Sequence, residues 1–178
     1  MKKKLEKSDL RIGILGGTFD PPHFGHLHIS KVALKKFKLH KLMWIVAKSN
    51  PFKKKPFLSI QMRVNLSKNI TKNNKKISIK YFKNKINLES TFNLLSFLKN
   101  KNKNKRLFFM IGADNMIELH KWKNWKKIPD LAKIVVFARP NYSKNIKNSV
   151  ASKKLKKNDW IYINSKKMNI SSTLIRKF

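Results

Sequence analysis

The stretch that decides the fold covers residues 10–26 and reads Leu10-Arg11-Ile12-Gly13-Ile14-Leu15-Gly16-Gly17-Thr18-Phe19-Asp20-Pro21-Pro22-His23-Phe24-Gly25-His26. Its first six residues are apolar apart from Arg11, and they predict a buried strand. Two glycines and a proline-containing turn follow. Apolar residues then recur at helical spacing, which predicts a helix from about Gly25 to Phe37. A glycine turn between a strand and a helix lets the backbone approach a phosphate group closely.

The rest of the chain alternates short apolar runs with helical patterns. Strands are predicted at residues 42–47, 77–80, 107–111, 134–138 and 160–163. Helices are predicted after Ser59 through Met62 and Leu66, after Ser90 or Thr91, and after Ser171. Such alternation implies right-handed crossovers and a parallel sheet that is covered on both faces. We therefore expect an α/β fold, a Rossmann-like doubly wound parallel sheet, in a single domain over residues 1–178 with a basic tail at residues 1–9.

The net charge is +35, from 43 Lys and Arg against eight acidic residues. Such a surface attracts polyanions, so a nucleic-acid-binding protein is one alternative. The lysines are, however, spread along the whole chain and are not gathered in one stripe or tail. We therefore expect no specific nucleic-acid partner, although the positive field should help to recruit anionic nucleotides.

Composition also excludes several classes of protein. The chain has no Cys, which excludes a disulfide framework and thiolate chemistry. No run approaches the roughly 18 consecutive apolar residues of a membrane span, and the basic N-terminus lacks the apolar stretch of a signal peptide. These features favour a cytoplasmic protein with no membrane partner. The sequence leaves the oligomeric state open, and a homo-oligomer is compatible with it.

His23 and His26 lie three residues apart at the predicted helix start. There they share a face beside unpaired backbone N–H groups that favour anions. Imidazoles at such a position can donate hydrogen bonds to phosphate oxygens, and these bonds can strengthen as charge builds in a transition state. Zinc binding is the alternative, but one pair without Cys or matching carboxylates does not complete a zinc site. We therefore predict no protein-bound metal.

Ligands of open parallel sheets bind beyond the carboxyl ends of the strands. Two informative segments follow predicted strands: residues 16–26 after the first, and Gly112-Ala113-Asp114 after a central one. Asp114 is a candidate ligand contact there, with helix capping as its alternative role.

The segment from Gly16 to His26 resembles the signature of the nucleotidylyltransferase superfamily, whose core is His-x-Gly-His. The chain's far end agrees, because Ile170-Ser171-Ser172-Thr173-Leu174-Ile175-Arg176 resembles the superfamily's second motif. Hydroxyls and N–H groups at that helix start, with Arg176 one turn later, would make a second anion site. Two anion sites from opposite ends of one chain suit a triphosphate held along its length.

Within the superfamily, four features resemble the nicotinate-nucleotide adenylyltransferases. These are the Gly-Gly-Thr-Phe-Asp-Pro form of the signature, the segment Met110-Ile111-Gly112-Ala113-Asp114, the pair Lys121-Trp122 and the segment Val136-Phe137-Ala138-Arg139-Pro140. The resemblance runs from about residue 11 to 178. One departure lies at Asn50-Pro51-Phe52-Lys53, where Phe52 replaces a His that is usual in the family.

The resemblance implies adenylyl transfer from ATP to nicotinate mononucleotide, with Mg²⁺ arriving on ATP. It implies catalytic roles for His23 and His26. It implies ATP or phosphate contacts for Gly16, Gly17, Thr18, Phe19, Lys53, Gly112, Asp114, Ser171, Ser172, Thr173 and Arg176. It implies nicotinate-nucleotide contacts for Thr91, Trp122 and Arg139, whereas Trp125 is expected in the core. Other acceptors (nicotinamide mononucleotide or pantetheine phosphate) and CTP in place of ATP stay open.

Overall fold

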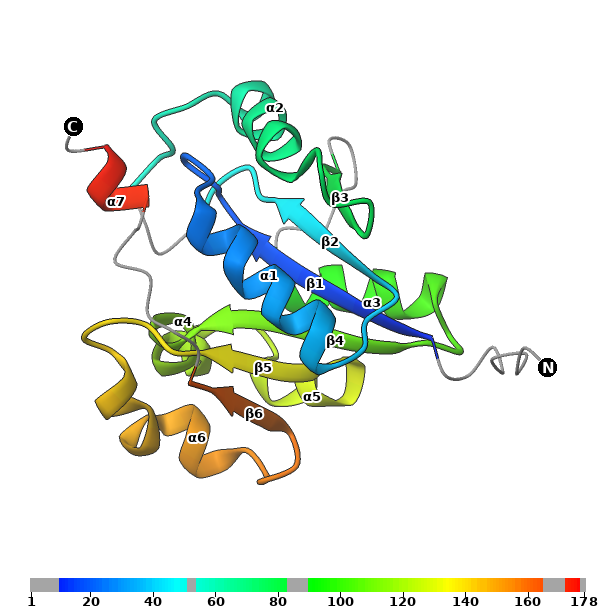
Figure 1. Ribbon diagram of the computed structural model, residues 1–178. Coiled ribbons are helices and arrows are strands. Elements are labelled where there is room, and N and C mark those ends of the chain that lie inside the picture. Colours follow the sequence, from blue (N-terminus) through cyan, green and yellow to red (C-terminus); the bar gives the residue numbers. More distant parts are fainter. Residues whose placement is uncertain (1–9, 51–53, 83–89, 165–171, 177–178) are drawn as a thin grey trace.

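The computed structural model describes residues 10–50, 54–82, 90–164 and 172–176. Six parallel strands form one sheet in the order β3-β2-β1-β4-β5-β6 (Figure 1). The strands are β1 (Arg11–Gly17), β2 (Lys41–Val46), β3 (Ile77–Lys80), β4 (Arg106–Gly112), β5 (Lys133–Phe137) and β6 (Trp160–Ile163). The order reverses between β1 and β4, so the loops that leave these two strands diverge and open a crevice at the carboxyl edge.

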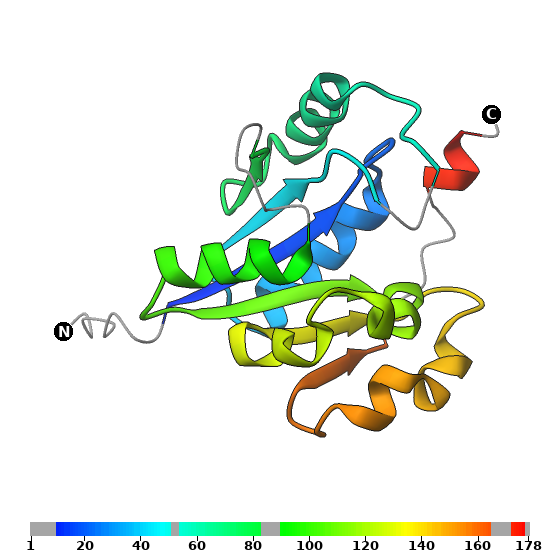
Figure 2. The ribbon, with the colours of Figure 1, turned by 180° about the vertical axis from the view of Figure 1, so that it is seen from behind.

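Helices cover both faces of the sheet. The α-helices are α1 (Phe24–Lys36), α2 (Ile60–Thr71), α3 (Thr91–Lys101), α4 (Ala113–Glu118), α5 (Ile128–Leu131), α6 (Val150–Lys154) and α7 (Ser172–Ile175). Short 3₁₀ helices are η2 (Leu119–Lys121), η3 (Trp125–Lys127) and η4 (Ser143–Asn148). Helices α1 and α2 lie in front of the sheet in Figure 1, and Figure 2 shows α3, α4 and α5 on the opposite face. The predicted doubly wound fold is thus confirmed.

Two hydrophobic clusters, one on each face, follow from the alternation of side chains along buried strands. In β1, Ile12 and Ile14 belong to the cluster under α3, α4 and α5. Leu15 belongs to the cluster under α1 and α2, together with Trp44 of β2. Both faces are therefore apolar, which explains why β1, β2, β4 and β5 read as continuous apolar runs.

Helix α2 departs from the usual apolar-inward pattern. Arg63, Ser67 and Thr71, four residues apart, are its buried residues, whereas Met62 and Leu66 are exposed. The hydroxyls of Ser67 and Thr71 are satisfied within the helix, because each donates to the carbonyl four residues earlier at 2.7 and 2.8 Å. Of the three buried polar side chains, the guanidinium of Arg63 is therefore the one that forms hydrogen bonds with other segments of the chain.

Most predicted boundaries agree with the structure to within one or two residues. Ser59 caps α2 as predicted, and of the two candidates for α3 the cap is Ser90, whose hydroxyl accepts from Asn93 N–H at 3.1 Å. Residues 141–158, which showed only weak patterning, contain η4 and α6. None of the helices in the described ranges is long and apolar enough to cross a membrane. The basic tail at residues 1–9 lies outside the described residues.

Gly13 offers a test of the packing between β1 and the start of β2. A Cβ added there would lie 2.7 Å from Leu39 Cδ1 and 3.0 Å from Leu42 Cγ, and both leucines are fully buried. We expect Gly13→Ala to lower the free energy of unfolding by about 1–3 kcal/mol through overpacking, measured by urea denaturation. Gly16→Ala is the control, because its Cβ would meet only Phe109 at 3.9 Å. Equal stability of the two variants would contradict this account.

Candidate active site

The end of β1 and the loop that leads to α1, residues 16–23 together, lie at the point where the strand order reverses. Gly16, which ends the buried part of β1, is exposed. A Cβ at Gly16 would meet no atom closer than Phe109 at 3.9 Å, so the packing of the chain itself does not require glycine. A side chain here would instead project into the crevice between β1 and β4, where a ligand would bind.

Phe19, in this β1–α1 loop, has a strained backbone conformation. Its φ is 50°, in the left-handed region, which costs a bulky residue about 1–3 kcal/mol. Its ring is buried and stacks on Trp44, with centroids 4.9 Å apart and an angle of 9° between the planes. The ring of Phe19 is therefore a core group, and only its backbone is available to the phosphate contact predicted for it.

The two imidazoles of the His-x-Gly-His motif are in contact. Their centroids lie 3.8 Å apart, and His23 N–H donates to Nδ1 of His26 at 3.2 Å. Because Nδ1 of His26 accepts, the proton of the neutral ring is assigned to Nε2. The structure thus brings the two predicted catalytic residues together at the N-terminus of α1, where the helix dipole favours an anion.

Three buried groups hold His26. Its ring packs against Phe19 and Trp44, with centroid distances of 4.9 and 5.9 Å. The indole N–H of Trp44 donates to Ser30 Oγ at 2.8 Å, and that hydroxyl donates to the carbonyl of His26 at 2.7 Å. The catalytic candidate is therefore fixed through both its ring and its backbone by a residue of the neighbouring strand.

His23 is neutral at physiological pH. Burial lowers its pKa to about 4, and the positive charge of Arg139 acts in the same direction. Arg139 follows β5, which is separated from β1 in the sheet by β4 alone.

Asp114 and Arg139 form an ion pair between the loops after β4 and β5. Gly112 is the N-cap of α4, so the capping alternative for Asp114 is wrong. Asp114 instead lies in the first turn of α4 and accepts from Arg139. Arg139, predicted to contact the nicotinate nucleotide, also lies 6.0 Å from the ring centroid of Tyr142. The pair fixes a carboxylate and a guanidinium beside the imidazoles.

An aromatic group lies on the other side of the sheet end. Trp122 packs edge-on against Phe109, with centroids 6.4 Å apart, and Phe109 is the residue that a Cβ at Gly16 would meet. Trp122 and Trp125 are both partly buried against the same core cluster, as expected for Trp125. Thr91, the first residue of α3, lies at the carboxyl edge because α3 runs back towards the start of β4.

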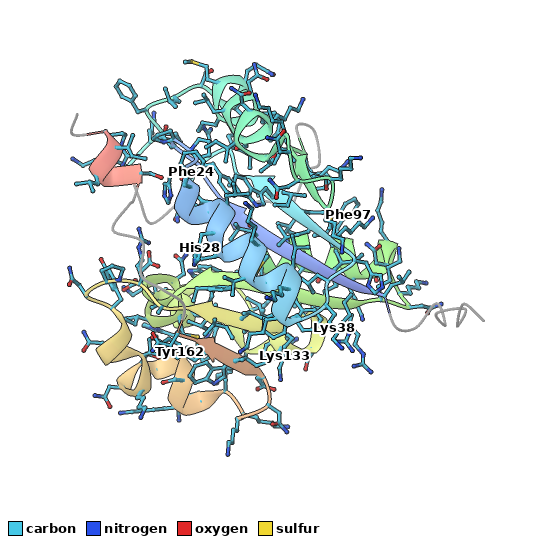
Figure 3. All side chains as sticks on the ribbon, viewed as in Figure 1. Phe24, His28, Lys38, Phe97, Lys133 and Tyr162 are labelled. Carbon is cyan, nitrogen blue, oxygen red and sulfur yellow. The ribbon has the colours of Figure 1, made fainter. Side chains whose placement is uncertain are left out.

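The C-terminal motif docks on the β1–α1 loop. Ser172 Oγ donates to the carbonyl of Pro21 at 2.8 Å. Arg176 donates to the carbonyl of Asp20 and lies 3.4 Å from its carboxylate. In Figure 3, Phe24 lies at the end of α1 nearest to α7, and Lys38 lies near the other end of that helix. The two predicted anion sites are thus neighbours, whereas Lys53, Ser171 and the side chain of Thr173 lie outside the described residues.

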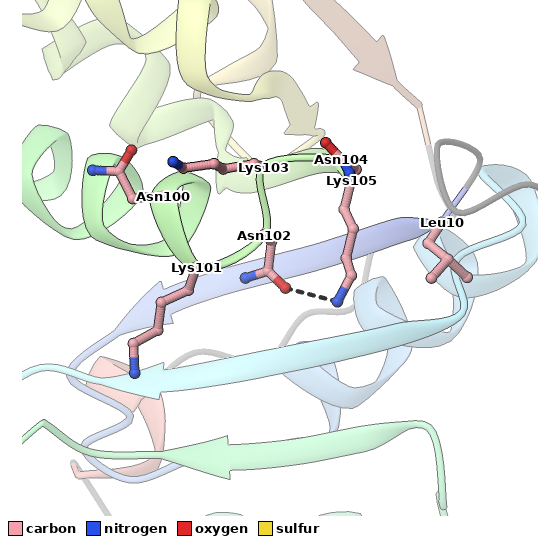
Figure 4. A pocket seen from close by; sticks show the side chains of 7 residues that line it. All are labelled: Leu10, Asn100, Lys101, Asn102, Lys103, Asn104 and Lys105. Atoms are coloured by element: carbon pink, nitrogen blue, oxygen red, sulfur yellow. Dashed lines mark hydrogen bonds between the residues drawn. The ribbon is translucent and has the colours of Figure 1, made fainter.

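Two further observations bear on what the site can hold. In the described ranges, no group of three or more His, Cys, Asp or Glu side chains is placed to hold a metal ion. A shallow pocket of about 470 Å³ lies at the opposite edge of the sheet, lined by Leu10 and residues 100–105 (Figure 4). Its polar groups are Lys and Asn, among them Lys105, which donates to Asn102 at 3.0 Å. This pocket is remote from the imidazoles.

Comparison with known proteins gives the family. A family model described as cytidylyltransferase-like matches residues 14–178. A nicotinate-nucleotide adenylyltransferase relative from Pelagibacter ubique (strain HTCC1062) is 40% identical over 176 residues, covering 99% of this chain and 97% of the relative. The chain belongs to the nicotinate-nucleotide adenylyltransferase family. The family predicted from the sequence is thereby confirmed.

Other members of the nicotinate-nucleotide adenylyltransferase family agree. A relative from Clostridium tetani (strain Massachusetts / E88) is 35% identical, covering 99% of this chain and 86% of that protein. Among solved structures, the nicotinic acid mononucleotide adenylyltransferase of Plasmodium falciparum complexed with NaAD has a TM-score of 0.75 and 24% identity, covering 95% of this chain and 83% of that one. The same enzyme complexed with APC has a TM-score of 0.73. These structures share the fold.

Several residues that shape this family's site in the present chain were not predicted from the sequence. Asp20 accepts from Phe57 N–H and Leu58 N–H, both at 2.8 Å, and so ties the β1–α1 loop to the segment before α2. Arg63 contacts the same loop, and Trp44 supports His26. Of these three residues, only Asp20 lies within a motif that the sequence analysis recognised, the signature from Gly16 to His26. The other two lie in ordinary helix and strand patterns.

The low pKa of His23 makes stability depend on pH. The unfolded chain binds this proton at pH 6.5 and the folded chain only at about 4, so the unfolded state holds more protons between these values. We expect the free energy of unfolding to fall as the pH drops through 6.5 towards 4, and the contribution of His23 to be constant from about one pH unit above 6.5. NMR titration of the ring should give the pKa directly.

Arg139→Gln should raise the pKa of His23 by removing the nearby positive charge, while leaving it below 6.5 because burial is the larger cause. Arg139→Lys, which keeps the charge, is the matched control. An unchanged titration in Arg139→Gln would show that Arg139 does not act on His23.

Gly16→Ala should weaken ATP binding without loss of stability. The added methyl group meets no protein atom closer than 3.9 Å and would occupy the crevice, so we expect roughly a tenfold rise in Kd, or about 1.4 kcal/mol. Isothermal titration calorimetry gives the affinity and thermal unfolding the stability. ATP affinity equal to that of the unsubstituted protein would place the nucleotide elsewhere.

Proposed function

We propose that this protein transfers the adenylyl group of ATP to nicotinate mononucleotide, giving nicotinate adenine dinucleotide and pyrophosphate. The observation that carries the proposal is the contact pair His23 and His26 at the carboxyl end of β1, beside the docked C-terminal motif. The names of relatives that match over the whole chain support the acceptor. The Plasmodium falciparum enzyme complexed with NaAD supports the product.

In the proposed reaction, a phosphate oxygen of nicotinate mononucleotide attacks the α-phosphorus of ATP. The new P–O bond forms as the bond to the oxygen bridging the α- and β-phosphorus breaks, and pyrophosphate leaves with that electron pair. The acceptor phosphate has a second pKa of about 6, so it is already an anion and needs no general base. The protein must therefore supply alignment and charge neutralisation.

His23 and His26 would bind the α- and β-phosphate oxygens. His23 is neutral in the free protein, since burial lowers its pKa to about 4. A bound phosphate favours the protonated ring and raises this pKa. The imidazole would donate a hydrogen bond where the leaving group develops its charge, and that bond strengthens as the charge builds.

The remaining contacts would surround this pair. The backbone of the β1–α1 loop, at Gly16, Gly17, Thr18 and Phe19, would meet the phosphates, and Ser172 and Arg176 the leaving pyrophosphate. From the sequence motifs we assign Lys53, Ser171 and Thr173 to the same phosphates. Gly112 and Asp114 would hold the adenosine ribose, and Thr91, Trp122 and Arg139 the nicotinate nucleotide.

Mg²⁺ enters this proposal as part of the substrate, bound to ATP. The acidic groups nearest to the imidazoles are engaged, Asp20 with two backbone N–H groups and Arg176, and Asp114 with Arg139. They do not fit a resident metal site. We place the reaction in the cytoplasm, where ATP and free nucleotides are available.

The reaction is tested by pyrophosphate release from ATP and Mg²⁺, with nicotinate mononucleotide, nicotinamide mononucleotide and phosphopantetheine supplied separately. We expect release with nicotinate mononucleotide alone. Release with another acceptor would keep the chemistry but overturn the roles of Thr91 and Trp122. No release with any acceptor would overturn the proposed function.

His23→Ala should lower kcat roughly 100-fold, the usual loss on removing one donor to a developing charge, with a smaller change in KM for ATP. His40→Ala is the control, because His40 lies at the opposite edge of the sheet and accepts from Arg11 N–H. Steady-state kinetics of pyrophosphate release give kcat and KM for ATP in both variants. Normal turnover by His23→Ala would remove His23 from the mechanism.

A further inference from the structure

Arg63 of α2 is a buried cation whose hydrogen bonds all reach loops at the carboxyl edge. Its Nη1 donates to the carbonyls of Thr18 and Ala47, both at 2.7 Å. Its Nη2 donates to Lys48 O at 3.0 Å, and its Nε to Leu58 O at 3.1 Å. One side chain, 2% exposed, therefore joins the loop after β1, the loop after β2 and the segment before α2.

The bond to Thr18 fixes the direction of one peptide unit. A trans peptide is planar, so its C=O and N–H groups point in opposite directions. Because the carbonyl of Thr18 points to Arg63, the N–H of Phe19 points away from Arg63 and from the loop after β2 that Arg63 holds. The neighbour of β1 on that other side is β4, and the crevice opens between these two strands.

The N–H of Phe19 donates no hydrogen bond within the described part of the chain. Phe19 is also the residue whose φ of 50° is strained. Strain of this kind persists only where the surroundings over-determine the backbone. Here Arg63 holds the carbonyl before Phe19, and Asp20, the residue after it, is held by Phe57 N–H and Leu58 N–H. The loop is therefore anchored on both sides of the strained residue.

We propose that Arg63 is a positioning residue, which sets the Thr18–Phe19 peptide so that the Phe19 N–H donates to a phosphate oxygen of the bound nucleotide. The inference rests on the proposed function for the identity of that nucleotide. Arg63 itself does not touch the substrate, since it is 2% exposed and carbonyls occupy four of its five donors. It acts by aiming a backbone donor at the charge that builds during transfer.

The chemistry of the side chain explains why Arg fills this place. A guanidinium is planar and presents five N–H donors in a fixed fork, so it can join several carbonyls from different loops. A Lys offers a single nitrogen and cannot bond the carbonyls of Thr18, Ala47, Lys48 and Leu58 from one position. Arg63→Lys keeps the charge and therefore isolates the geometry.

Kinetics of Arg63→Lys and Arg63→Met form the first test. We expect kcat for pyrophosphate release to fall roughly 100-fold, with KM for ATP changing far less. Ser67→Ala is the matched control, because Ser67 is a buried residue of the same helix whose hydroxyl bonds only to Arg63 O. It should keep the kcat of the unsubstituted protein. Each variant is assayed at a temperature at which circular dichroism shows it folded.

The second test follows the Phe19 amide directly by NMR. With phenylalanine labelled with ¹⁵N, the Phe19 amide resonance should move on titration with ATP and Mg²⁺ in the unsubstituted protein and in Ser67→Ala. It should not move in Arg63→Lys. Should Arg63→Met not fold, Arg63→Lys carries both tests.

The outcomes separate this inference from the proposed function. An Arg63→Lys variant with normal kcat and a normal response of the Phe19 amide would overturn the positioning role, whatever its effect on thermal stability. A protein that binds ATP through this amide yet transfers nothing to nicotinate mononucleotide would leave the role of Arg63 standing and reject the proposed reaction.

Discussion

The candidate site depends on how the backbone is held in the loops that follow β1 and β2, where the hydrogen bonds of the sheet have ended. Within the strands, β1 and β2 are locked by their ladder, which extends to Gly17 and Val46, with one more bond from Ala47 N–H to Gly17 O. Beyond that point the carbonyls of Thr18, Ala47 and Lys48 have no partner strand. The buried guanidinium of Arg63 donates hydrogen bonds to these three carbonyls. Burial lowers the pKa of Arg63, but the side chain keeps its charge.

A second layer of support surrounds this interaction. Trp44 lies under the β1–α1 loop, where it stacks on Phe19 and, through Ser30, holds the backbone of His26. Asp20 ties the same loop to the segment before α2. Trp44, Phe19, Ser30 and Asp20 are all buried, and they lie in β2, α1 and the loop between β1 and α1. The sheet half formed by β4 and β5 contributes the ion pair of Asp114 and Arg139.

The sequence predicted the fold, and it singled out the segments that meet at the candidate site, because both depend on local patterns. Apolar runs set the strands, and the signature at residues 16–26 identifies the turn and the helix start. The role of Arg63 could not be predicted, since its acceptors are backbone carbonyls of distant segments and no residue type marks them. Asp114 and Arg139 were each singled out, but their pairing spans 25 residues and follows from the strand order. The exposure of Met62 and Leu66 follows from Arg63, which occupies the inward face of α2.

The docking of Ser172 on Pro21 joins residues 151 positions apart, and this has a consequence for how the site is assembled. All six strands precede Ser172 in the chain, so the sheet and the imidazoles can form without the C-terminal motif. A folded chain in which α7 has left the β1–α1 loop would possess one of the two predicted anion sites and lack the other. Completion of the predicted site is therefore a step separate from the folding of the core.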